Sequence, residues 1–136
     1  MKKIKNNLLK NILFAFLIII VILVVYFFLV LDVRSFKMHI KVGNNAGFNL
    51  SDQLEFGIVY PDTSASKKIF VQNTDYEKTR VVIKAYGDLK DWVIVSENNF
   101  VMNKGEFKNL RVEVLAPEDA EYKDYYGELR IIFLRF

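Results

Sequence analysis

Residues 12–31 read ILFAFLIIIVILVVYFFLVL, twenty consecutive residues without a charge, a glycine or a proline. A helix of this length extends roughly 30 Å, the thickness of the hydrocarbon core of a bilayer. A helix in the core of a soluble protein would carry polar residues at a 3.6-residue period. Here Tyr26 is the only partly polar side chain, so the stretch predicts a transmembrane helix.

A removable signal peptide is the alternative interpretation of such a segment. Cleaved signal peptides have a shorter apolar region, about 7–15 residues, followed by small residues at the cleavage site. Here the apolar run is longer and ends in LDVRSF, residues 31–36, which contains no small-x-small pair. We therefore expect an uncleaved signal anchor.

The charges on either side of the span predict its orientation. Four lysines and no acidic residue precede the span, whereas one arginine, two lysines and one aspartate lie between residues 32 and 41. Positive charge beside a span favours the cytoplasmic side. We expect a basic cytoplasmic tail at residues 1–11, a short linker at 32–35, and an extracytoplasmic domain of the cell membrane at 36–136.

Charge and cysteine content exclude several classes of function for the part beyond the span. Residues 32–136 hold fifteen basic and sixteen acidic residues, a net charge of −1, so the +3 of the whole chain comes from the four N-terminal lysines. A nucleic-acid-binding domain needs a basic excess to displace counterions from phosphate, so we expect no nucleic-acid partner. The chain has no cysteine, which excludes disulfides and thiolate metal sites.

Alternation of apolar and polar residues starts soon after the span. Residues 36–42, FKMHIKV, and residues 109–114, NLRVEV, both have the period of two that is typical of half-buried strands. Further short apolar segments are separated by turn-forming residues such as PDTSAS at 61–66 and NKGE at 103–106. Many short strands with regular turns predict an antiparallel sandwich or barrel.

Six of these segments form an ordered pattern over about residues 50–134. They are LEFGxVYP at 54–61, KxIxVxN at 67–73, DWVxVS at 91–96, FxMxxGE at 100–106, APEDA at 116–120 and YxGxL at 125–129. This pattern resembles a large group of immunoglobulin-like modules of archaeal surface and membrane proteins and, more distantly, major-sperm-protein-like domains. It departs from that group's usual Pro-Gly at Pro61-Asp62 and Lys104-Gly105, and from its usual glycine before the final tyrosine at Lys123-Asp124.

The resemblance implies an all-β fold, a seven-stranded antiparallel immunoglobulin-like sandwich, behind the transmembrane helix. In this fold Trp92 and Tyr125 are expected in the core or in a tyrosine corner. The resemblance implies little about activity, because such modules serve mostly as spacers, adhesion units or assembly subunits.

Residues that could carry catalysis are few. His39 is the only histidine and is expected on the solvated face of the first strand, and none of the five serines lies in a Gly-x-Ser-x-Gly motif. The six glycines are scattered rather than gathered in a phosphate-binding loop. We therefore expect a non-enzymatic protein with no catalytic residue, no cofactor and no small-molecule substrate.

Two weaker patterns point to ligands on loops. Calcium takes several oxygens from one loop, and acidic residues gather at Glu118, Asp119, Glu121 and Asp124. That loop lacks the Asp-x-Asp-x-Asp-Gly ladder, so a solvated strand connection is the preferred interpretation and no metal is predicted. Asn49 begins the only Asn-x-Ser/Thr triplet and is a glycosylation candidate if the domain lies outside the cell.

Surface apolar residues are the main indication of function. If Leu129, Ile131 and Phe133 face the core, alternate residues of the last strand face the other side, and Phe70 likewise opposes its two apolar neighbours. A strand that is apolar on both faces is a poor solvated edge. The interaction candidates are therefore Phe70, Ile132, Leu134 and Phe136. They could contact a protein partner, a second copy or the membrane surface, unless the N-terminal strand or a loop covers them.

Two functions are compatible with these features. The first is a membrane-tethered module for adhesion, surface structure or protein assembly. The alternative is an accessory subunit of a membrane complex, such as a pilus-like filament or a secretion machine. Archaeal pilin-type subunits usually carry a small residue before the apolar run and a glutamate just inside it, where this chain has Lys10-Asn11-Ile12.

Overall fold

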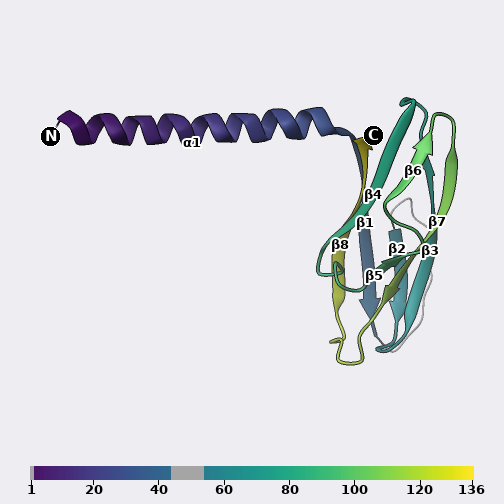
Figure 1. Cartoon of the computed structure of the whole chain (residues 1–136). Helices are drawn as coiled ribbons and strands as arrows, with labels where there is room; N and C mark the ends of the chain where they lie inside the picture. Colours follow the sequence, from purple (N-terminus) through teal and green to yellow (C-terminus); the bar gives the residue numbers. More distant parts are fainter. Residues whose placement is uncertain (1, 44–53) are drawn as a thin grey trace.

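A long helix projects from one end of a body made of two β-sheets (Figure 1). The computed structural model describes residues 2–43 and 54–136, with side chains described from Lys10 onward. The elements in chain order are α1 (Lys2–Leu29), β1 (Val30–Val42), β2 (Leu54–Val59), β3 (Ser64–Gln72), β4 (Lys78–Gly87), β5 (Val93–Val95), β6 (Phe100–Asn103), β7 (Phe107–Leu115) and β8 (Asp124–Arg135). The chain is mostly β behind one N-terminal apolar helix, as the sequence predicted.

Helix α1 does not bury its apolar surface against the two sheets. Every residue from Lys10 to Leu29 is exposed, and apolar side chains surround the helix on all sides. A helix that is apolar all round requires an apolar environment. Its length and composition suffice to cross a membrane, although a signal sequence near an N-terminus shares both properties.

The junction between helix and body differs from the sequence-based expectation. Helix α1 ends at Leu29 and β1 begins at Val30, so the last two residues of the predicted span are strand. Residues 32–35, the expected linker, also lie in β1. They do so because β8 supplies a pairing partner along this whole stretch, with Val33 opposite Ile132. Helix and sheet are therefore joined without a linker.

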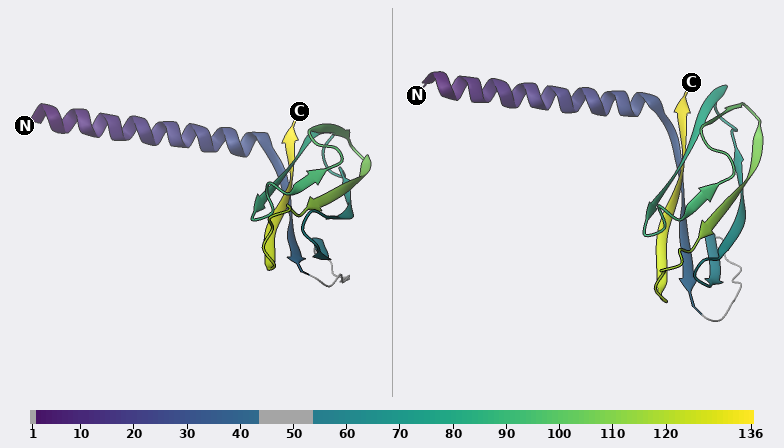
Figure 2. Two further views of the ribbon diagram at one scale, coloured as in Figure 1. Left: turned by 90° about the horizontal axis from the view of Figure 1, so that it is seen from below. Right: turned by 60° about the horizontal axis from the view of Figure 1, so that its bottom comes forward.

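The strands form two packed sheets (Figure 2). Sheet A has the order β2-β1-β8-β4-β6, and sheet B has the order β3-β7-β5. All pairs are antiparallel except β1 and β2, which run parallel. The described residues thus form eight strands rather than seven, and the arrangement is not purely antiparallel. Alternation predicts which face a strand buries, but it does not specify the strand's direction or its partner.

The core lies between the two sheets and is built from alternate residues of each long strand. In β8, Leu129, Ile131 and Phe133 are buried, whereas Ile132 is half-buried and points to the opposite face. Sheet B contributes buried residues in the same way from β3 and β7, namely Ile69, Val71, Leu110, Val112 and Val114. The predicted inward and outward faces of the last strand are confirmed.

Trp92 and Tyr125 close one end of the core, as the sequence predicted. Their ring centroids lie 4.4 Å apart, Tyr125 is buried, and Trp92 is half-buried against the core. The Tyr125 hydroxyl donates a hydrogen bond to the Glu121 carbonyl oxygen four residues upstream, at 3.2 Å. This arrangement has the features of a tyrosine corner.

The pairing of β4 with β8 depends on a glycine. Gly127 lies opposite Gly87, and a Cβ added at Gly127 would lie 2.8 Å from the Tyr86 carbonyl oxygen and 3.1 Å from the Leu89 Cβ. Because backbone and core both block this position, Gly127→Ala should force the two strands apart and lower the free energy of unfolding by about 1–3 kcal/mol.

Urea unfolding of the full chain in detergent, followed by the fluorescence of the single tryptophan, measures this loss. Gly43→Ala is the matched control, because its Cβ would meet only the Ile58 Cγ2 at an ordinary 3.5 Å. Equal midpoints for the two variants would show that β4 and β8 tolerate a side chain between them.

The β6–β7 turn contains a carboxylate that should make stability depend on pH. Glu106 accepts hydrogen bonds from the Asn103 side-chain Nδ2 at 2.9 Å and from the Asn103 backbone N at 2.8 Å. The side-chain bond is the largest of the influences that lower the Glu106 pKa, followed by the backbone bond and then by the charge of Lys108. A lowered folded-state pKa means that this stabilisation is present above the ordinary glutamate pKa and is lost as the pH falls through the folded value.

We therefore expect the stability difference between wild type and Glu106→Gln to be largest near neutral pH. It should shrink as the pH falls below about 4, as measured by urea midpoints over a pH series. Asn103→Ala, which removes only the side-chain donor, should reduce the same pH-dependent difference. A difference that stays constant over the series would contradict this role for the turn.

Candidate interaction surfaces

An apolar strip crosses the outer face of sheet A near the helix. Strand register places Val33, Ile132 and Val82 in one row over β1, β8 and β4. Leu134 lies two residues further along β8, opposite Arg80. Val33 is 39% exposed, and the other three apolar residues are half-buried. The predicted candidates Ile132 and Leu134 thus belong to a surface shared by three strands.

Strand β1 does not cover these residues. It lies beside β8 in the same sheet and adds Val33 to the face. Val33 could have been identified from the sequence, because it has the same alternation parity as Ser35, Lys37 and His39 on the predicted outer face. The sequence analysis did not identify Val33 because it assigned residues 32–35 to a linker rather than to the first strand.

Phe136 lies at the same end of sheet A, next to two cations. The Lys78 Nζ is 4.1 Å and the Arg80 Cζ is 5.7 Å from the centroid of its ring, within the range of cation–π attraction. The ring is 59% exposed. With Leu29 at the helix end and Leu134, it lines a hollow of about 330 Å³ at the helix–sheet junction.

Basic side chains surround the apolar strip. Lys84 lies opposite Arg130 across the β4–β8 pair, and Arg130 holds Glu128 through two hydrogen bonds of 3.1 and 3.0 Å. The Arg130 hydrogen bonds are the main cause that lowers the Glu128 pKa, and Glu128 in turn raises the pKa of Arg130. This carboxylate is therefore paired, and the rim of the strip keeps a positive excess from Lys78, Arg80 and Lys84.

The outer face of sheet B carries an exposed aromatic pair, Phe70 of β3 and Phe107 of β7. Their ring centroids are 5.4 Å apart in a stacked arrangement, and the residues are 54% and 61% exposed. Ile94 and Leu115 are further exposed apolar residues of this sheet. Phe70 was a predicted candidate, and Phe107 was missed. Its parity with Asn109, Arg111 and Glu113 in the sequence would have placed it on the same solvent face.

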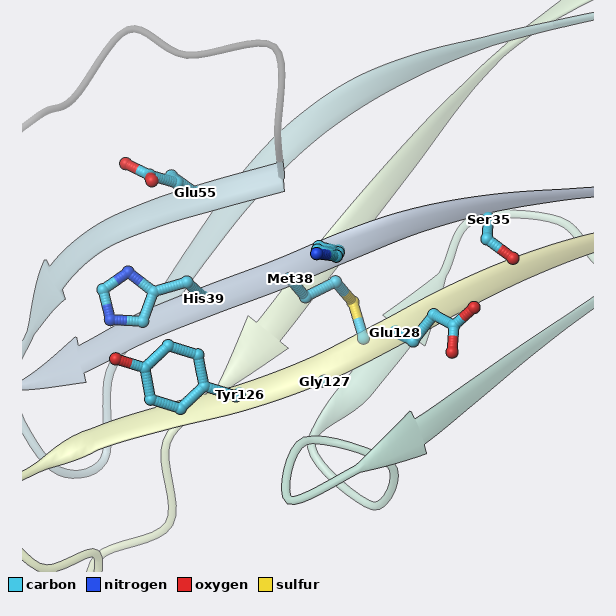
Figure 3. A pocket seen from close by; sticks show the side chains of 8 residues that line it. Ser35, Met38, His39, Glu55, Tyr126, Gly127 and Glu128 are labelled. Atoms are coloured by element: carbon cyan, nitrogen blue, oxygen red, sulfur yellow. The ribbon is translucent and has the colours of Figure 1, made fainter.

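A second, larger hollow of about 820 Å³ lies on sheet A further from the helix (Figure 3). Here the His39 ring stacks on Tyr126 with centroids 4.8 Å apart, and its Nε2 lies 2.9 Å from the Asp124 Oδ1. His39 is on the polar face of β1, as expected, but it is held by two partners rather than fully solvated. The sequence could not indicate this because Asp124 is 85 residues away.

Among the described residues that line this hollow, Ser35 is not brought to the histidine. Ser35 also lines it, but Ser35 and His39 lie four residues apart on the same face of one strand. At about 3.3 Å per residue, that spacing separates their backbones by about 13 Å. A nucleophile and its base must approach within hydrogen-bonding distance, so these two side chains do not form such a pair.

The acidic loop does not gather into a metal site. Glu121 contacts the Lys123 Nζ at 2.7 Å, which is the main cause of its lowered pKa, and Asp124 is paired with His39. Within residues 10–43 and 54–136, no group of three or more His, Cys, Asp or Glu side chains is placed to hold a metal ion. The four acidic candidates, Glu118 and Asp119 included, therefore lack a common centre. Asn49 lies outside the described residues.

Comparisons with protein-family models, with curated proteins and with solved structures found no match for this chain. The resemblance to immunoglobulin-like modules therefore stays a prediction, and the geometry of the surfaces is the basis on which a function can be proposed.

Proposed function

We propose that this chain is a single-pass membrane protein that presents a non-enzymatic, immunoglobulin-like domain outside the cell for adhesion, surface structure or protein assembly. Helix α1 would serve as an uncleaved anchor, with the lysine-rich N-terminus in the cytoplasm. The length of the charge-free stretch of α1 supports the anchoring, and the four lysines that precede that stretch support the orientation.

The observation that carries the proposal is the exposed pair of Phe70 and Phe107. Aromatic side chains are enriched where proteins bind one another, because they bury large areas at little cost in conformational entropy. This pair lies on sheet B, whereas the helix meets the body at β1 and β8 of sheet A. An anchored domain would therefore hold the pair on its far side, available to another protein.

The immunoglobulin-like assignment is supported by the two packed sheets and by the tyrosine-corner contact of Tyr125. The eight strands and the parallel β1–β2 pair distinguish this body from the simplest seven-stranded form. A non-enzymatic role is supported by the separation of Ser35 from His39 and by the pairing of His39 with Asp124.

The alternative, an accessory subunit of a membrane complex, is favoured by the junction. A domain that searches for distant ligands benefits from a flexible stalk, whereas here the helix continues directly into β1. A fixed angle between helix and domain suits a subunit that contacts its neighbours with both parts.

Protease added to intact cells should test the orientation. Proteases should degrade the domain and leave the helix if residues 36–136 lie outside. Protection in intact cells, with degradation only after lysis, would reverse the topology. Release of the whole chain by alkaline carbonate would contradict anchoring itself.

Crosslinking in native membranes, followed by mass spectrometry, should test the aromatic pair. We expect the double variant Phe70→Ser/Phe107→Ser to reduce the amount of crosslinked protein partner at least tenfold. Both side chains are exposed, so the fold should remain intact, which circular dichroism checks. Tyr122→Ser is the matched control, since this loop aromatic is 61% exposed. Retention of the same partner by the double variant would contradict the proposed surface.

A further inference from the structure

The outer face of sheet A lies on the side of the body from which the helix projects. In Figures 1 and 2 the helix leaves across the direction of β1 and β8, while β3 and β7 lie on the far side. One contact of the body reaches the helix, and a second reaches β1 two residues after the helix ends. The Arg135 Cζ lies 4.3 Å from the centroid of the Phe28 ring, and the Tyr76 hydroxyl donates to the Leu31 carbonyl oxygen at 3.1 Å.

From this geometry we infer that the outer face of sheet A rests on the headgroups of an anionic bilayer, the one that α1 spans. The apolar strip of Val33, Ile132, Val82 and Leu134 would contact the upper acyl region, and the basic rim would contact lipid phosphates. This inference rests on the proposed anchoring by α1, and it goes beyond it by assigning a binding surface on the body.

The chemistry of the face fits this occupant better than a protein. Interfacial surfaces combine apolar residues that enter the acyl boundary with lysines and arginines that reach phosphate. Here Arg80 and Lys84 lie on β4 beside the strip, and Lys78 lies at its end next to Phe136. The exposed Phe136 ring lies at the level of the helix end, where aromatic residues gather at membrane interfaces.

The positive charges of the body are concentrated on the side that would face the membrane. Residues 32–136 have a net charge of −1, yet the half of sheet A nearest the helix has a cationic outer face. On this half of the face Glu128 is paired with Arg130, and Asp32, which lies opposite the buried Phe133 and thus on the other face, is paired with Arg34 at 3.1 Å. Asp124 and Glu55 lie in the half of the sheet that is further from the helix. A bilayer with anionic lipid is therefore complementary to the near half.

The absence of cysteine makes a direct test possible, because one introduced thiol carries one label. The full chain, reconstituted into vesicles of phosphatidylcholine and phosphatidylglycerol at 7:3, would carry an environment-sensitive fluorophore at Val82→Cys. The matched control is Asn109→Cys, which is exposed on sheet B. A nitroxide attached to the lipid headgroup is the quencher. We expect the label at position 82 to be quenched at least threefold more than the label at 109.

Charge variants separate the contribution of the rim. Arg80→Glu/Lys84→Glu should reduce quenching at position 82 at least threefold, and 0.5 M salt should act in the same direction. Lys68→Glu/Arg111→Glu is the matched control, because these two exposed residues lie opposite each other on sheet B. It makes the same change in net charge and should leave the quenching at 82 unchanged. Equal effects of the two double variants would overturn the role of the rim.

The two proposals fail in different ways. If the chain does not float with vesicles, anchoring by α1 fails and the inference fails with it. If the chain floats but the labels at 82 and 109 are quenched equally, anchoring stands and the inference is overturned. If the label at position 82 is protected from solvent more strongly at higher protein density but is not quenched by the lipid nitroxide, the face binds a second copy of the chain. That result would also overturn the inference. The fluorescence of Trp92 confirms that each labelled variant is folded.

Discussion

The pairing of β1 with β8 is the constraint on which the rest of the structure depends. It runs from Val30 to Lys41, and it places β8 between β1 and β4 in the centre of sheet A. The same pairing fixes which residues of β8 enter the core and which form the apolar strip. It also begins one residue after the helix, so the position of the helix relative to the body follows from strand register and not from a linker.

The alternation in the sequence predicted the faces of the strands well, because each half-buried strand needs one apolar side regardless of its neighbours. That logic identified the buried side of β8 and the exposed position of Phe70. It could not reveal that β1 and β2 run parallel, since direction depends on pairing between distant segments. The charge-free run, in turn, placed the end of the helix two residues too late, because Val30 and Leu31 suit a strand as well as they suit lipid, and pairing with β8 makes them strand.

The candidate surfaces show the same division. Single outward residues such as Leu134 were predictable from parity, but their combination was not. Joining Val33, Ile132 and Val82 requires the register of three strands that are far apart in the chain. The pairing of His39 with Asp124 likewise depends on β1 lying against β8. The acidic loop is the opposite case, because closeness in sequence suggested a cluster that the folded loop does not form.

The direct continuation of α1 into β1 links the orientation of the helix to the orientation of the sheets. Membrane helices adjust to the thickness of the bilayer by tilting, and a flexible connector would absorb such a tilt. This chain has Leu29 in the helix and Val30 in the sheet, with Arg135 and Tyr76 bracing the junction from the body. If α1 spans a bilayer as proposed, a change in helix tilt would be passed on to the two sheets, so bilayer thickness would affect how closely sheet A approaches the lipid and where Phe70 and Phe107 face.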